Sequence, residues 1–107
     1  MYVIKRVWIP KPRQARLVAS IVAEIGKIYV DVGQREAPIV YFNNGTLPAE
    51  TDEVVMQWTS EIIDSPYRED NELPDTGEFG KKLRELTEES WIEFYELLTP
   101  SKLVPIE

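Results

Sequence analysis

Alternating apolar and polar positions predict two short strands in the first half of the chain. Residues 2–9 alternate in the manner of a half-buried strand, and Pro10 and Pro12 would end it because proline fixes φ and removes a backbone donor. Residues 38–42 form a second apolar run whose proline stands at its first position, where a strand tolerates it. The turn-forming residues 43–45 follow, so this half of the chain is expected to be rich in β-structure.

The longest apolar run, residues 15–33, fits two structures. As a helix, its polar side chains recur every three or four residues and would form one stripe: Arg13, Arg16, Ser20, Glu24 and Lys27. As a β-hairpin with a turn at Gly26 and Lys27, every odd position from 15 to 25 is apolar, and the apolar faces of both arms coincide.

Local chemistry favours the hairpin. No Ser, Thr, Asp or Asn lies between Val7 and Leu17 to serve as a helix N-cap, and the first arm of the run contains four β-branched residues, Val18, Ile21, Val22 and Ile25. The alanines, and Gly26 at a possible helix end, favour the helix instead. We therefore predict a hairpin and retain the helix as the alternative.

The second half reads as two helices. Residues 46–64 place apolar residues on one face and acids on the other, with Thr46 as N-cap, which predicts an amphipathic helix. A second helix is expected over residues 75–98, entered through Asp75 and Glu78, with a possible break at Thr87. Its last part, residues 91–98, is apolar around most of its circumference, which is typical of a segment that is buried or contacts a partner.

These elements predict a single α+β domain over residues 1–107. An antiparallel β-meander of three or four strands would come from residues 1–45, and two acidic amphipathic helices from residues 46–107 would cover it. The alternative, with residues 13–25 helical, is a ferredoxin-like β-α-β-β-α-α layout.

Composition argues against catalysis. The chain has no Cys and no His, so it lacks a thiolate nucleophile, Cys-ligated zinc and the usual general base at neutral pH. We predict no enzyme activity, no catalytic residue, no metal site and no cofactor. No stretch has the length of a membrane span or the pattern of a signal peptide, so we expect a soluble, cytoplasmic protein.

Charge divides the chain into two halves. Residues 1–45 carry a net charge of +4 and residues 46–107 a net charge of −11. Acidic surfaces beside aromatic residues suit protein binding, because Trp and Tyr anchor interfaces and an acidic field speeds encounter with a partner. We therefore predict a protein-interaction module, a small regulator or inhibitor that also self-associates through an uncovered sheet edge or residues 91–98. The candidate partner-binding residues are Trp58, Trp91, Phe94, Tyr95, Glu89 and Glu93.

Nucleic-acid binding is the alternative function. Basic side chains of the first half would engage phosphates, and the aromatic residues among them would stack on unpaired bases. The candidate residues on this basic sheet face are Tyr2, Lys5, Arg6, Trp8, Lys11, Arg13, Arg16 and Arg35.

Overall fold

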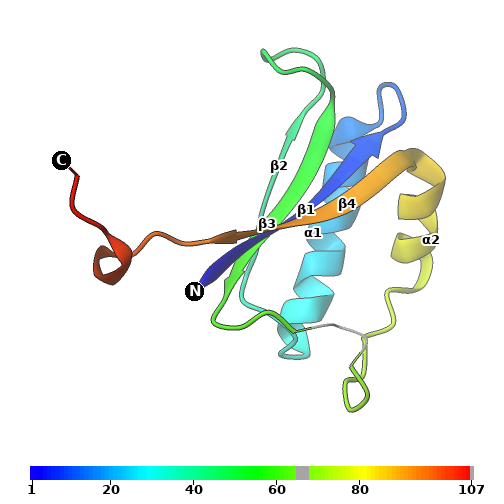
Figure 1. The fold of residues 1–107 in the computed structure, drawn as a ribbon. Helices are drawn as coiled ribbons and strands as arrows, with labels where there is room; N and C mark the ends of the chain where they lie inside the picture. Colours follow the sequence, from blue (N-terminus) through cyan, green and yellow to red (C-terminus); the bar gives the residue numbers. More distant parts are fainter. Residues whose placement is uncertain (65–67, 107) are drawn as a thin grey trace.

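The computed structural model describes residues 1–64 and 68–106. Four strands, two α-helices and a short 3₁₀-helix follow one another along the chain (Figure 1). Their bounds are β1 (Tyr2–Pro10), α1 (Ala15–Asp31), β2 (Ile39–Asn43), β3 (Glu53–Ser60), α2 (Gly77–Leu86), β4 (Thr87–Glu96) and η1 (Pro100–Lys102).

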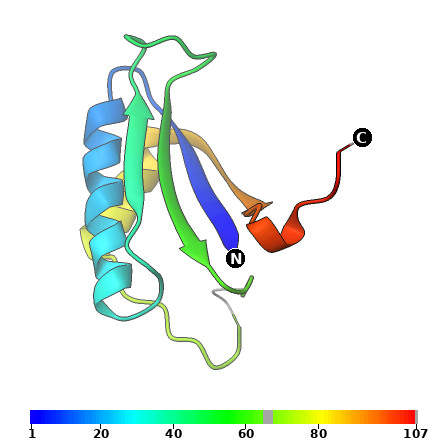
Figure 2. The same cartoon turned by 90° about the vertical axis from the view of Figure 1, so that its left-hand side faces the viewer.

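The strands form one antiparallel sheet in the order β2-β3-β1-β4. Both α-helices lie on the same face of this sheet, and no α-helix of the described residues lies on the opposite face (Figure 2). The element order β-α-β-β-α-β with this strand order is the ferredoxin-like α+β arrangement. The predicted class, an antiparallel four-stranded sheet covered by two helices, is confirmed, whereas the predicted meander is wrong because α1 separates β1 from β2.

The core lies between α1 and the central strands. Val18 and Val22 of α1 are fully buried against Trp8 of β1 and against Val54 and Met56 of β3. This contact between one helix face and two interior strands supplies the main hydrophobic stabilisation of the fold.

Residues 15–31 form helix α1, so the hairpin predicted over residues 15–33 is wrong. The expected weakness at the start of this helix is real, since Gln14 makes no side-chain capping bond. A backbone hydrogen bond orders the turn that precedes the helix, where the Gln14 N–H donates to the Lys11 carbonyl at 3.0 Å. Burial of Val18 and Val22 on the sheet then stabilises the helix, since tertiary packing outweighs local propensity.

The helix predicted over residues 46–64 is also wrong, because residues 53–60 form strand β3. Val54, Val55 and Met56 are consecutive and all buried, with Val54 and Met56 on the side of α1 and Val55 on the opposite side of this interior strand. Two of the acids that produced the helical pattern lie outside the strand, with Glu50 before it and Glu61 after it.

The predicted helix over residues 75–98 is half right. Helix α2 ends at Leu86, and the chain continues directly as strand β4 from Thr87, the position where a break was considered. Asp75 does help to start the helix, since its Oδ1 accepts the Gly77 N–H at 2.8 Å.

Neither helix is acidic. Helix α1 balances Arg16 and Lys27 against two acids, and α2 carries more basic than acidic residues, so most of the acids in the described second half lie on strands and loops instead. Within the described ranges, no helix combines the length and the apolarity needed to span a bilayer.

The packing of α1 predicts the outcome of truncating one of its valines. Val22→Ala should lower the free energy of unfolding by about 2 kcal/mol, because two buried methyl groups are lost and a cavity remains. Leu17→Ala on the same helix, where the side chain is 47% exposed, should change it by less than about 0.5 kcal/mol. Urea denaturation measures both, and equal values for the two variants would contradict this packing.

Candidate functional site

The face of the sheet opposite the helices, called the open face here, has an apolar row at its centre. Tyr41, Val55, Val7 and Trp91 are paired across β2, β3, β1 and β4, and paired residues of an antiparallel sheet point to the same side. Val7 and Val55, at the centre of this row, are buried although no α-helix of the described residues lies on this face. The row therefore forms a continuous apolar strip across all four strands.

The next row of the open face is mainly polar. It runs from Ile39 through Gln57 and Lys5 to Glu93. The Tyr41 hydroxyl donates to Oε1 of Gln57 at 2.8 Å, so this part of the face is ordered by side-chain contacts between strands.

The carboxylate of Glu93 is held by two aromatic side chains of its own strand. The Trp91 Nε1–H donates to Oε2 at 2.6 Å, and the Tyr95 hydroxyl donates to Oε1. The hydrogen bond from Tyr95 contributes most to lowering the pKa of Glu93, and the bond from Trp91 contributes next. Nearby Lys5 acts in the same direction. The same bond raises the pKa of Tyr95, because it stabilises the protonated phenol. Trp91, Glu93 and Tyr95 thus form an ordered aromatic cluster on an edge strand.

The C-terminal segment leaves the sheet on the side of the open face. Figures 1 and 2 both show residues 97–106 projecting from the end of β4 away from the helices. The segment is tied to the body near its start, where the Leu97 N–H donates to the Met1 carbonyl at 3.0 Å. Beyond that point Leu98, Leu103, Val104 and Ile106 are all more than 60% exposed. It is therefore an apolar arm without a packing surface in the described part of its own chain.

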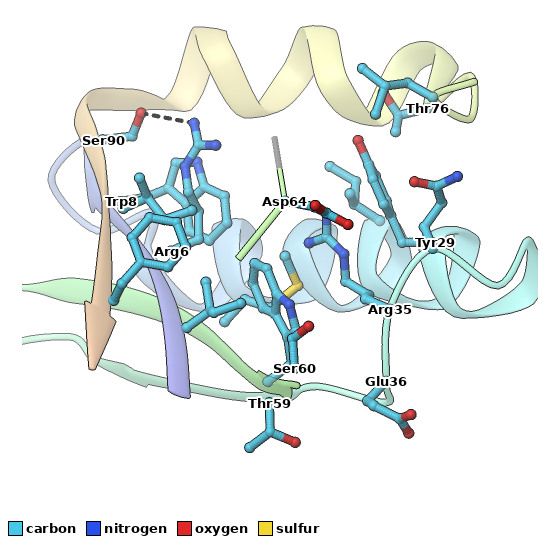
Figure 3. Close-up of a pocket in the computed structure, with 18 of the residues that line it drawn as sticks. Arg6, Trp8, Tyr29, Arg35, Glu36, Thr59, Ser60, Asp64, Thr76 and Ser90 are labelled. Atoms are coloured by element: carbon cyan, nitrogen blue, oxygen red, sulfur yellow. Dashed lines mark hydrogen bonds between the residues drawn. The ribbon is translucent and has the colours of Figure 1, made fainter. Parts of the chain in front are cut away.

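A cavity of about 1140 Å³ lies on the other face, between α2 and the sheet (Figure 3). Strands β1, β3 and β4 form its floor, and the C-terminal end of α1 with the following loop forms one side. Apolar side chains of the floor, among them Trp58, Ile92 and Phe94, face it. Two arginines, Arg6 and Arg35, enter the cavity from different elements (Figure 3).

The guanidinium of Arg35 lies between two aromatic rings. Its central carbon is 4.0 Å from the centre of the Tyr29 ring and 4.1 Å from that of Trp58. Burial lowers the pKa of Arg35, Tyr29 opposes this shift, and the positive charge of Arg6 adds to it. The group stays charged at neutral pH, because arginine is not deprotonated in proteins.

Arg6 is incompletely satisfied. Its Nη2 contacts the Ser90 hydroxyl at 3.4 Å, and its guanidinium lies 5.4 Å from the centre of the Trp8 ring. Its Nε is buried and has no hydrogen-bond partner among the described residues. No carboxylate of residues 1–64 and 68–106 forms an ion pair with Arg6 or Arg35.

The structure separates the predicted partner-binding residues. Trp91, Tyr95, Glu93 and Glu89 share one side of β4 and belong to the open face. Trp58 and Phe94 face the cavity on the opposite side of the sheet.

The predicted basic residues do not share a sheet face. Lys5 lies on the open face, 5.9 Å from the centre of the Tyr95 ring. Trp8 is buried, so its ring cannot stack on a base. The others divide between the cavity side (Arg6 and Arg35), the loop after β1 (Lys11 and Arg13), the exposed surface of α1 (Arg16) and the end of β1 (Tyr2). Nucleic-acid binding through a basic sheet face stays a prediction that this arrangement does not favour.

Sequence reasoning missed several residues of both surfaces. Tyr41 and Gln57 complete the open face, and Tyr29 and Ser90 complete the surroundings of the two arginines. Tyr41 lay in a correctly predicted strand and could have been included on that ground. The others depend on contacts between distant segments. In the described part of the chain, no group of three or more acids has the geometry of a metal site.

The bonds around Glu93 predict its response to mutation. Tyr95→Phe should raise the pKa of Glu93 towards its ordinary value, because the hydrogen bond from Tyr95 is the largest cause of the lowering. A pH titration of the Glu93 side-chain carbonyl by NMR measures this pKa. Tyr41→Phe, which removes a hydroxyl bonded to Gln57 instead, is the control and should leave the titration unchanged. A Glu93 midpoint that stays fixed in Tyr95→Phe would show that the bond does not form in solution.

Comparison with known proteins finds a similar structure but does not assign this chain to a family. No family model matches the chain, and no curated protein matches it. The crystal structure of a NIPSNAP family protein from Agrobacterium tumefaciens is similar to it, with a TM-score of 0.55 over 99% of this chain and 98% of that chain. The two sequences are 16% identical, so the similarity shows a shared ferredoxin-like α+β fold.

Proposed function

We propose that the protein is a non-enzymatic protein-interaction module that self-associates through its open face. The observation that carries this proposal is the apolar row Tyr41, Val55, Val7 and Trp91, which crosses a sheet face that no helix covers. A regulatory or inhibitory partner would compete with the second copy for the same face.

The composition of the open face supports an interface. Tyr41 is 41% exposed and Tyr95 is 51% exposed, and such aromatic residues supply most of the binding energy of protein interfaces. Their polar atoms are already paired with Gln57 and Glu93, so burial would not leave them unsatisfied. Two sheets can pack face to face in this way, with interdigitated side chains between them.

A second copy of the chain is the occupant that fits best. The open face carries Lys5 together with Glu89 and Glu93, and a two-fold axis can bring the lysine of one copy opposite an acid of the other. The apolar arm, residues 97–106, projects on the same side and would pack against the second copy. Self-association would thus cover the exposed aromatic residues of the open face, Tyr41 and Tyr95, together with the apolar arm.

Substitution at the row should break the dimer. The wild-type protein should sediment with twice the chain mass of 12.4 kDa, and Tyr41→Arg should raise the dimer dissociation constant roughly tenfold or more, because it places two like charges in an apolar interface. Sedimentation velocity over a range of concentrations measures this constant.

The matched control is Leu17→Arg. This side chain is similarly exposed, at 47%, but lies on α1 on the other side of the sheet, so its substitution should leave the dimer intact. Circular dichroism confirms that both variants fold. A wild-type protein that is monomeric at every concentration would refute self-association.

The arm gives a separate prediction. Replacing Leu103 and Val104 together by serine should also weaken the dimer, since both side chains would be buried against the second copy. The stability of the isolated chain should not change, because these residues are exposed there. If the double variant dimerises like the wild type, the arm has no part in the interface.

A further inference from the structure

We propose that the cavity between α2 and the sheet binds an organic carboxylate with an apolar body. Arg6 and Arg35 would hold the carboxylate, and the apolar floor of the cavity, which includes Trp58, Ile92 and Phe94, would hold the body. This site is distinct from the open face, because it lies on the other side of the sheet.

Arg35 is arranged to receive an anion. Its guanidinium lies over the rings of both Tyr29 and Trp58, and these two contacts restrict its orientation. No ion pair joins Arg35 to an acid of the described residues, so its N–H groups, which lie in the plane of the guanidinium, can bond to an anion at its edge. A planar, oriented donor fork of this kind matches the geometry of a carboxylate.

Arg6 supplies a second cation from the sheet floor. Its buried Nε without a partner and its long contact to Ser90 leave the guanidinium under-satisfied, which costs free energy in the unliganded protein. An oxyanion beside it would offset that cost. The Ser90 hydroxyl can accept from Arg6 and still donate its own hydrogen to the same ligand.

The floor of the cavity suits an apolar group. Ile92 is 46% exposed and Phe94 is 45% exposed, although both point to the helix side of the sheet. Helix α2 has no buried residue and does not cover them. The aromatic ring of Trp58, which stacks on Arg35, brings the apolar and cationic parts of the site together.

The charge around the cavity favours an anionic ligand. Arg68, Arg84 and the Met1 ammonium also line it, and so do three acids, Glu36, Glu61 and Asp64. With the two central arginines, the described lining thus has five cationic and three anionic groups. This excess of positive charge attracts an anion.

The test uses decanoate and its neutral counterpart decanol, both below the concentration at which they aggregate. Isothermal titration calorimetry on the full chain should show saturable binding of decanoate. The affinity for decanol should be lower by roughly tenfold or more. NMR shifts of the Trp58 indole should accompany binding. Absence of saturable decanoate binding, or equal affinity for decanol, would overturn the proposal.

Three variants locate the site. Arg35→Gln and Arg6→Gln should each lower decanoate affinity roughly tenfold or more, while decanol affinity stays unchanged. Arg16→Gln removes a charge from the exposed surface of α1 and is the matched control, with wild-type affinity expected. If Arg35→Gln fails to fold, Arg35→Lys keeps the charge without the planar fork and should still weaken binding. Wild-type affinity in the folded Arg35 and Arg6 variants would refute the assignment.

Tyr41→Arg separates this proposal from self-association. It should disrupt the dimer and leave decanoate affinity unchanged, since Tyr41 faces the opposite side of the sheet. Loss of decanoate binding in this folded variant would place the ligand on the open face and overturn the cavity site.

Discussion

The close approach of α1 to the central strands is the contact on which both candidate surfaces depend. Gly26 permits it, because a Cβ at this position would come within 3.0 Å of Cγ of Pro38 and 3.2 Å of Sδ of Met56. Helix α1 is therefore seated tightly on the sheet, with Val18 and Val22 fully buried. Helix α2 has no buried residue, and the cavity lies between it and the sheet. Unequal packing of the two helices thus leaves room for a ligand without weakening the core.

Strand alternation then gives the two sides of the sheet different chemistry. Neighbours in β1 and β4 point in opposite directions, so Lys5 and Glu93 belong to the open face while Arg6 and Phe94 belong to the cavity. On the open face Lys5 lies beside the ring of Tyr95, and the carboxylate of Glu93 accepts hydrogen bonds from Trp91 and Tyr95. In the cavity the two arginines have rings beside them and no acid in an ion pair within the described residues. The first arrangement suits a protein interface, and the second suits a small anion.

Local patterns in the sequence correctly predicted the two strands β1 and β2. They led to wrong predictions for an interior strand, for a strand with aromatic residues on both faces, and for α1. Residues 2–9 and 38–42 were predicted as strands, and β1 and β2 are found there. Strand β3 is buried on both faces, so it has no alternation to detect, and the acids at its ends imitated a helix. Strand β4 carries aromatic residues on both faces, which read as an all-round apolar helix. In α1 the missing N-cap favoured a hairpin. Burial of the helix against strands distant in sequence outweighed the absence of a capping side chain.

The candidate sites were harder to predict, because charge along the chain does not map onto charge in space. The sequence divides into a basic and an acidic half, which suggests a protein with two oppositely charged sides. The strand order removes that division, since β1 of the basic half lies between β3 and β4 of the acidic half. Each basic residue of β1 is consequently placed among side chains from the other half, and Lys5 meets Tyr95 while Arg6 meets Ser90. Arg35 reaches Trp58 through the same interleaving. A site assembled across such a crossover is specified by the topology, so knowledge of the strand order is needed before any list of charged residues can identify it.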